Sequence, residues 1–203
     1  MKSEGFLEAL TLQRLTRRIQ SMRIIAGNAK GRKLKSPKSA KVIRPALSIV
    51  REAIFSALGD VTDKCFLDVF AGTGSLGLEA LSRGALRADF VDGGDEAVGL
   101  IIENLKILGF SDRGHVFKRK LPFGIRSLKL VSPPDIIFCD PPYDRGLLVP
   151  TLKLLEKHIV VDPQTLIIVE HSPRESPRCA GLTIIKERRY GQTLISTLQR
   201  ITD

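Results

Sequence analysis

The feature of this 203-residue sequence that most limits its fold is an apolar run that leads into a glycine-rich turn. The run begins at Cys65, and Gly72, Gly74 and Gly77 follow it with the spacing G-x-G-x-x-G, ahead of a stretch with helical periodicity. A turn of this kind between a buried strand and a helix exposes backbone N–H groups and lets a ligand approach closely. The spacing alone suits many nucleotide-binding proteins, so neighbouring residues must distinguish among them.

From Cys65 onward, apolar strand-like runs alternate with helical patterns. We expect strands near residues 65–70, 88–92, 115–119, 135–139 and 165–170. We expect helices near residues 75–83, 95–108 and 147–158, and a shorter one near 123–130. Such alternation predicts an α/β fold with a mostly parallel, doubly wound sheet, which an antiparallel hairpin over 182–199 would close.

Two carboxylates near the glycine turn narrow the class of ligand. Asp68 precedes Gly72 by four residues, where it would repel a pyrophosphate and favour a cationic group. Asp92 ends the next strand and is placed to accept hydrogen bonds from a ribose diol. Together with Phe70 and Gly74 in the turn, these residues predict a binding site for S-adenosylmethionine (AdoMet), which carries an amino group beside a sulfonium.

The sequence Asp140-Pro141-Pro142-Tyr143 directly follows the apolar run 136–139. Open α/β sheets bind ligands at the carboxyl ends of their strands, and two prolines force the chain to leave the sheet in a rigid turn. That turn offers a carboxylate and free carbonyls to an amino group, and Tyr143 to the face of a planar base. The structural alternative is a proline-rich exit with a solvent-facing aspartate.

Positive charge is concentrated near the N-terminus. Residues 1–51 contain 13 Lys/Arg and 2 Asp/Glu, and residues 22–51 contain nine basic residues and no acid. The rest of the chain is balanced, with 19 basic and 20 acidic residues. A solvated basic face is the usual explanation of a charge run, but beside a catalytic domain we interpret this one as a nucleic-acid-binding surface. The predicted RNA-binding residues are Arg23, Arg32, Lys33, Lys35, Arg44 and Arg51.

We divide the chain into three parts. Residues 1–21 form an N-terminal extension that need not be native, since the sequence from Met22 is typical of the start of a domain. Residues 22–58 form the basic segment, with a β-hairpin over 23–34 and a helix over 48–58. Residues 59–203 form the catalytic domain.

Composition limits the remaining possibilities. No apolar run reaches the ~18–20 residues of a membrane span, and the first residues lack a signal peptide. The three cysteines are widely spaced and read as reduced thiols, and the three histidines lack metal-ligand spacing. We therefore expect a cytoplasmic monomer that needs no metal and binds no membrane.

Several segments together resemble the RsmD-type family of 16S rRNA (guanine-N2)-methyltransferases. They are Met22–Gly27 with Gly31–Leu34, Arg44–Pro45 with Val50–Phe55, Leu67–Gly84, Glu103–Leu105, Asp140–Tyr143 and Tyr190–Thr193. The resemblance covers the chain from Met22 nearly to its end. The glycine turn and Asp-Pro-Pro-Tyr are common to many methyltransferases, whereas the basic segment in front of them makes the resemblance specific.

The resemblance implies a class I AdoMet-dependent methyltransferase that acts on the exocyclic N2 of a guanine in 16S rRNA or the small ribosomal subunit. This sequence departs from the family in three places. Residues 1–21 precede the usual start of the family. After the second strand the family usually carries Glu with another acid two residues on, where this sequence has Asp92 and Asp95. After the third strand the family usually has an Asp or Asn that binds the adenine, where this sequence has Lys120-Leu121.

Two other functions remain open. One is methylation of adenine N6 in DNA or RNA, or of a protein amide, since such enzymes use the same kind of acceptor loop. The other is a non-catalytic nucleic-acid-binding protein on a methyltransferase fold. The presence of Asp68, Gly72, Gly74, Asp140 and Tyr143 disfavours this second possibility.

Overall fold

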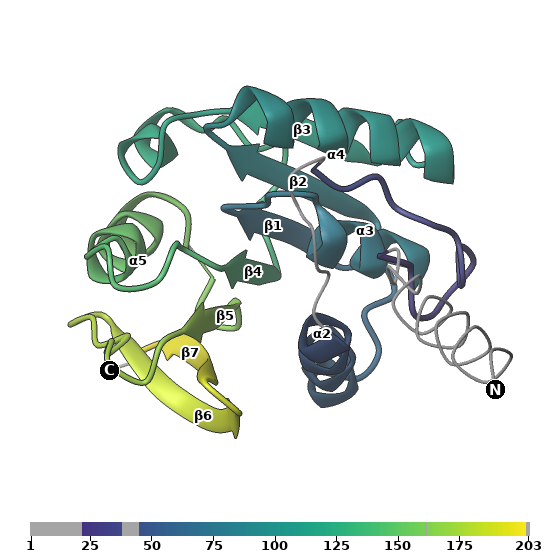
Figure 1. Cartoon of the computed structure of the whole chain (residues 1–203). Helices are drawn as coiled ribbons and strands as arrows, with labels where there is room; N and C mark the ends of the chain where they lie inside the picture. The colour runs from purple at the N-terminus through teal and green to yellow at the C-terminus, as the bar shows by residue number, and fades with distance from the viewer. Residues whose placement is uncertain (1–21, 38–44, 161, 202–203) are drawn as a thin grey trace, which may run out of the picture.

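A seven-stranded sheet is the centre of this computed structural model, which describes residues 22–37, 45–160 and 162–201 (Figure 1). The strands are β1 Cys65–Val69, β2 Arg87–Asp92, β3 Gly114–Lys118, β4 Ile136–Cys139, β5 Leu166–His171, β6 Leu182–Tyr190 and β7 Thr193–Arg200. Their spatial order is β3-β2-β1-β4-β5-β7-β6, and β1 to β5 are parallel. β7 runs antiparallel to both β5 and β6, so the predicted fold class is confirmed.

Helices cover both faces of the sheet. They are α2 Pro45–Leu58, α3 Ser75–Ser82, α4 Asp95–Leu108, α5 Leu148–His158 and a 3₁₀ turn over Phe123–Ser127. Side chains alternate along each strand, so Phe66 and Phe138 pack against α2, α3 and α4. Leu67 and Ile137 point the other way and pack against α5 and the 3₁₀ turn. The sheet is buried on both faces, which is why its parallel strands read as apolar runs.

The strand order reverses between β1 and β4, which creates a crevice at their carboxyl ends. The register aligns four strand ends at this edge, because Val69 pairs with Val91 and Cys139, and Cys139 pairs with Val169. The next residue of each strand therefore lies in one row across the sheet. That row is Asp92, Phe70, Asp140 and Glu170.

The N-terminal segment, residues 22–37, differs from the expected β-hairpin. The antiparallel pairing is present but short: Arg23 and Lys33 form one isolated bridge, flanked by backbone hydrogen bonds from Ile24 N–H to the Arg32 carbonyl at 3.1 Å and from Leu34 N–H to the Met22 carbonyl at 2.8 Å. Beyond this bridge the backbone turns to α3, where the Glu79 carboxylate accepts the N–H of Ile25 at 2.8 Å and that of Ala26 at 2.9 Å. The segment is therefore a loop fastened to α3, and the purple trace in Figure 1 passes α3 on its way to α4.

Glu79 is fully buried on α3 and is the main anchor of this loop. Besides the two backbone N–H groups, its carboxylate accepts a hydrogen bond from Arg83 at 2.9 Å and lies 3.7 Å from the Arg51 guanidinium. Arg51 in turn donates to the Arg23 carbonyl at 2.7 Å. Buried charges are usually paired and hydrogen-bonded, and Glu79 meets both conditions, whereas Arg51 is paired and donates from one nitrogen but its Nε has no hydrogen-bond partner among the described residues.

Close backbone packing supports the anchor. A Cβ on Gly27 would lie 1.7 Å from the Ser82 carbonyl oxygen, so only glycine fits there. The Ser82 hydroxyl donates to the Ala26 carbonyl at 2.6 Å and accepts from the Ala29 N–H at 3.0 Å. Ile24, Ala29 and other residues of the loop belong to the same hydrophobic core as the sheet. The basic segment and the catalytic domain thus share one core.

Replacing Glu79 with Ala should destabilise the protein by about 3–5 kcal/mol, because Arg51 would be left buried without its counter-charge. Urea unfolding at neutral pH measures this change. Glu52→Ala on the exposed side of α2 is the control and should shift stability by less than about 0.5 kcal/mol. Equal unfolding curves for the two variants would contradict the anchoring role.

Candidate active site

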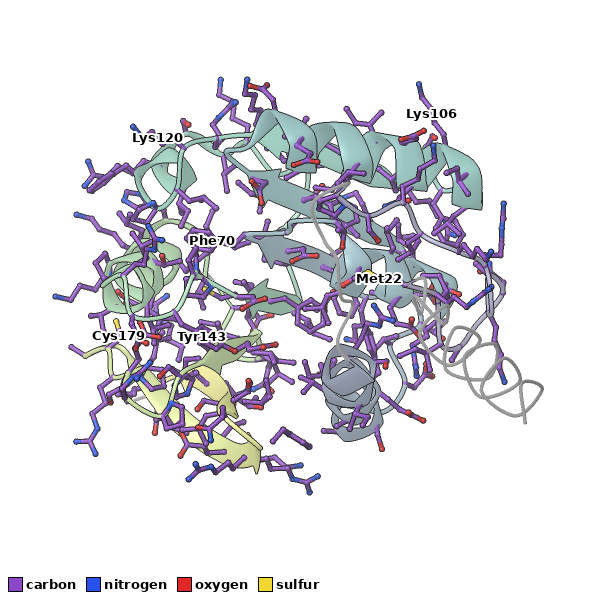
Figure 2. All side chains as sticks on the ribbon, viewed as in Figure 1. Met22, Phe70, Lys106, Lys120, Tyr143 and Cys179 are labelled. Carbon is purple, nitrogen blue, oxygen red and sulfur yellow. The ribbon has the colours of Figure 1, made fainter. Side chains whose placement is uncertain are left out.

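An open pocket of about 180 Å³ lies at the carboxyl edge of β1 and β4, where open α/β sheets bind their ligands. The glycine turn, α2 and the N-terminal Met22 contribute to its lining. Asp140 and Glu170 contribute the carboxylates that line it. Figure 2 shows Phe70 at the tip of β1 and Tyr143 beside β5.

The turn between β1 and α3 has an unusual backbone. Phe70, Gly72 and Gly74 have φ values of 64°, 56° and 75°, in the left-handed region. A bulky residue such as Phe70 rarely adopts this conformation, and such strain concentrates at ligand sites. A Cβ on Gly72 would meet no protein atom within 4 Å, whereas one on Gly74 would lie 3.2 Å from Ile101 and Phe90. Gly72 therefore borders open pocket space, and Gly74 allows close packing.

Asp92 fixes this turn from the neighbouring strand. One carboxylate oxygen accepts the Gly72 N–H at 2.9 Å, and the other accepts the Gly94 N–H at 2.9 Å. Each carboxylate oxygen has a second lone pair, so both can still accept a hydroxyl. The structure thus brings Asp92 and Gly72, both predicted to bind the cofactor, into direct contact.

Asp68 lies behind the turn, with only 3% of its surface exposed. It accepts the Gly77 N–H at 3.1 Å and so fastens the first turn of α3. Burial raises the pKa of Asp68 to about 7, with a smaller contribution from Asp92, although the Gly77 hydrogen bond opposes the shift. The structure gives Asp68 a role in shaping the turn, and its contact with a cofactor stays a prediction.

Asp140 follows β4 and is exposed to the pocket. Its carboxylate makes no hydrogen bond within the described ranges. Dense protein around the carboxylate removes much of its hydration, and the negative charges of Glu170 and Asp68 add to the effect, so the pKa of Asp140 is raised well above its usual value. Pro141 is buried and Pro142 is exposed, as expected for a rigid turn that leaves the sheet.

The C-terminal hairpin and β5 determine the position of Tyr143. Its hydroxyl donates to Glu170 at 2.7 Å and lies 3.2 Å from the Thr193 hydroxyl. Burial and the adjoining carboxylates raise the pKa of Tyr143, so the phenol stays protonated. Sequence reasoning missed Glu170, although its place directly after the apolar run of β5 was the signal that could have found it.

The predicted basic surface is only partly present. Arg51 is wrongly assigned to it, because its side chain is buried beside Glu79 and not exposed to RNA. Arg32 is exposed but donates to the Ile107 and Leu108 carbonyls, which end α4. Arg23 donates to the Gly31 carbonyl, and Lys35 forms an ion pair with Glu103 at 2.7 Å.

The remaining cations of the segment are less constrained. Lys30 and Lys33 are exposed. Arg44 lies outside the described residues. A second basic strip that charge counting missed lies on the edge strand β6, where three cations are exposed. They are Lys186, Arg188 and Arg189.

Comparisons with known proteins identify the family. A model of the family described as "Conserved hypothetical protein 95" matches residues 22–199. "Ribosomal RNA small subunit methyltransferase D" of Escherichia coli is 39% identical over 182 residues, which cover 88% of this chain and 90% of that protein. The same-named protein of Haemophilus influenzae is 33% identical and covers 84% and 89%. This chain belongs to the RsmD family of methyltransferases.

Solved structures agree with this assignment. The yhhF protein of Escherichia coli superimposes on this RsmD-family chain with a TM-score of 0.76 and 34% identity, over 90% of this chain and 99% of that one. A more distant RNA methyltransferase of Salinibacter ruber, at 14% identity and a TM-score of 0.62, shares the fold.

The described residues contain neither a membrane-spanning helix nor a cluster of metal ligands. No helix among them is long and apolar enough to cross a membrane. No group of three or more His, Cys, Asp or Glu residues in the same part of the chain is arranged to hold a metal ion.

The raised pKa of Asp68 predicts a pH dependence of stability. Because the folded-state value of about 7 exceeds the ordinary 3.8, the folded protein holds an extra proton between those values. Stability should therefore fall as pH rises through this window, by about 2–4 kcal/mol from this residue. Asp68→Asn should lose this component, which urea unfolding at pH 4.5 and 7.5 measures. A parallel pH profile in the variant would disprove the shift.

Proposed function

We propose that this protein transfers a methyl group from AdoMet to the exocyclic N2 of a guanine in 16S rRNA. One observation carries the proposal: a pocket in which the strained glycine turn meets the unpaired Asp140 carboxylate, in a chain of the RsmD family. The names of its relatives support small-subunit rRNA as the substrate. A cytoplasmic location and action as a monomer accompany the proposal.

The turn fits AdoMet, which supplies an activated methyl group. Gly72 leaves open space for a ligand beside an exposed backbone, and Phe70 lines the same pocket. Asp92 retains lone pairs for the ribose hydroxyls. The negative charge of Asp68 behind the turn favours a cationic ligand on the pocket side, since charges interact strongly where water is scarce. Gly74 keeps α3 close enough to the sheet for this arrangement.

Asp140 and Pro141 would position the guanine amino group. Guanine N2 is conjugated with its ring and is a weak nucleophile, so catalysis depends on orientation rather than on proton abstraction. If the Asp140 carboxylate and the Pro141 carbonyl both accept from N2, the nitrogen lone pair can face the methyl group. Pro142 keeps the turn rigid, and Tyr143 would hold the base by stacking once it leaves its helix.

Exposed cations of the N-terminal segment would bind the RNA backbone. Arg23, Lys33 and Lys35 keep exposed side chains next to the loop that reaches the pocket at Met22. Phosphate contacts position an RNA without reading its sequence. Arg32, which also contacts the end of α4, would add its positive charge to this RNA-binding surface. We propose that Arg44 contributes to the same surface.

Gly72→Ala should weaken AdoMet binding at least tenfold, because the new methyl group would enter the space left for the ligand. Gly59→Ala is a matched control, since Gly59 also has a positive φ, of 73°, and open space around its missing Cβ. Both variants carry a similar backbone strain of about 1–2 kcal/mol. Calorimetric titration with AdoMet compares them, and equal affinities would place the cofactor elsewhere.

The purified protein with AdoMet should add one methyl group to a guanine of 16S rRNA from cells that lack the gene, as mass mapping of the rRNA can show. Asp140→Ala should lower kcat by roughly 10²-fold or more and leave AdoMet affinity unchanged, because an orienting acceptor acts mainly in the transition state. A methylated adenine would favour the alternative reaction. A rise in KM alone would make Asp140 a binding residue.

The double variant Lys30→Ala/Lys33→Ala should weaken RNA binding and flatten its dependence on salt, because two phosphate contacts and their counterions would be lost. Removing Lys153 and Lys157 together is the control, since both are exposed on α5, which packs against the opposite face of the sheet. Filter binding at several salt concentrations measures both. The same loss in the two double variants would show that only net charge matters.

A further inference from the structure

We propose that Glu170 accepts the N1–H of the target guanine and so determines which base the enzyme methylates. The inference rests on the proposed function and deepens it, because the motif around Asp140 can bind any amino group. Glu170 would be a specificity-determining residue that acts on the base beside the reacting nitrogen.

The register of the sheet places Glu170 beside Asp140. Cys139 of β4 pairs with Val169 of β5, so the two acids are the next residues on adjacent parallel strands. Neighbouring strands lie about 4.8 Å apart, and residues at the same level point to the same face. Both acids line the same pocket. They form a pair of acceptors at its edge.

This pair has acceptor capacity that the protein does not use. One oxygen of Glu170 accepts the Tyr143 hydroxyl, and no other residue in the described ranges bonds to its carboxylate. The Asp140 carboxylate is without a hydrogen bond over the same residues. Glu170 is half-buried and Asp140 is exposed to the pocket, so the free lone pairs of both carboxylates are available to a ligand that donates. Burial and, after it, repulsion from Glu170 raise the pKa of Asp140, so a ligand that donates to both carboxylates would stabilise their charged forms.

Guanine has the donor pattern that complements two adjacent carboxylates. Its Watson–Crick edge carries N1–H beside the N2 amino group, so two donors face two acceptors. Adenine offers its N6 amino group beside an unprotonated N1, whose lone pair would face the Glu170 carboxylate. A site built for a hydrogen bond rejects an analogue that lacks it, because the buried group is left unpaired. Asp140 would bind the reacting amino group, and Glu170 would distinguish guanine from adenine.

A purely positioning role is the competing explanation, since Glu170 holds the Tyr143 hydroxyl. In that case the residue would act through Tyr143 and would be indifferent to N1. The two roles can be separated by a base that keeps the N2 amino group but lacks N1–H. 2-Aminopurine is such a base, and it also lacks O6.

The experiment compares wild type, Glu170→Gln and Tyr143→Phe on 16S rRNA with guanine or 2-aminopurine at the mapped target position. Wild type should lose about 10–100-fold in kcat/KM on 2-aminopurine, equivalent to the roughly 1–3 kcal/mol of an unpaired buried acceptor. Relative to wild type on guanine, Glu170→Gln should lose a similar factor on guanine, and on 2-aminopurine little more than any loss caused by the missing O6, because its amide can donate to N1. Relative to wild type, Tyr143→Phe should lower kcat/KM by the same factor on guanine as on 2-aminopurine. Any loss caused by O6 is common to all three proteins.

Melting temperature and AdoMet affinity, both expected to be unchanged in Glu170→Gln, confirm that the variant folds. If Glu170→Gln and wild type lose equally on 2-aminopurine, Glu170 does not contact N1 and the proposal is overturned. If wild type adds no methyl group to guanine, the proposed function itself fails. That outcome is distinct from the first, because it appears in the wild-type reaction on unmodified RNA.

Discussion

The buried carboxylate of Glu79 is the interaction on which the rest of this structure depends. It joins the N-terminal loop, Arg51 of α2 and Arg83 of α3 at one point inside the core. Removing one partner of such a pair costs several kcal/mol, because the other charge stays buried. α3 begins at the glycine turn, so the residue that fastens the basic loop to α3 also fixes the loop relative to the pocket.

The turn itself is held from three sides before any ligand arrives. Asp68 binds the Gly77 N–H, Asp92 binds the Gly72 N–H, and the Asn104 amide donates to the Thr73 carbonyl at 3.2 Å. Asn104 also exchanges two hydrogen bonds with the backbone of Lys35. A site that is ordered in advance loses less entropy on binding. The same contacts explain how Phe70 can keep a positive φ.

The sequence predicted the sheet, and three of the four residues in the row at its carboxyl edge, for a physical reason. Buried parallel strands are apolar runs that end in glycine, proline or acid, so both the strands and the residues at their carboxyl ends are visible in one dimension. Side-chain direction is not visible in this way. Arg51 belongs to a run of cations, yet it lies on the buried face of α2 because Glu79, 28 residues away, pairs with it.

Two other misses have similar causes. The cations of β6 escaped notice because they were counted with the whole of residues 52–203, where 19 basic and 20 acidic residues balance, although they lie together on an edge strand. Glu170 escaped notice because its meaning depends on the register of β4 and β5, which places it next to Asp140. Local patterns identify elements, whereas pairing between distant segments decides which charges meet.

The distribution of charge follows from that pairing. Asp68, Asp140 and Glu170 lie on the same face of the sheet, since strand residues two apart share a face and Asp68 is aligned with Phe138. Burial raises the pKa values of all three, and repulsion from Glu170 and Asp68 adds to the shift of Asp140, so binding of a cationic cofactor or of an amino group would stabilise their charged forms. Cations, in contrast, lie on the exposed loop and on β6. An RNA backbone would be attracted to these outer cations and repelled by the pocket, while the donor edge of a flipped base would be attracted into it. In the proposed function, the two carboxylates of the pocket would favour entry of a base over entry of phosphate, although Arg51 also lines the pocket.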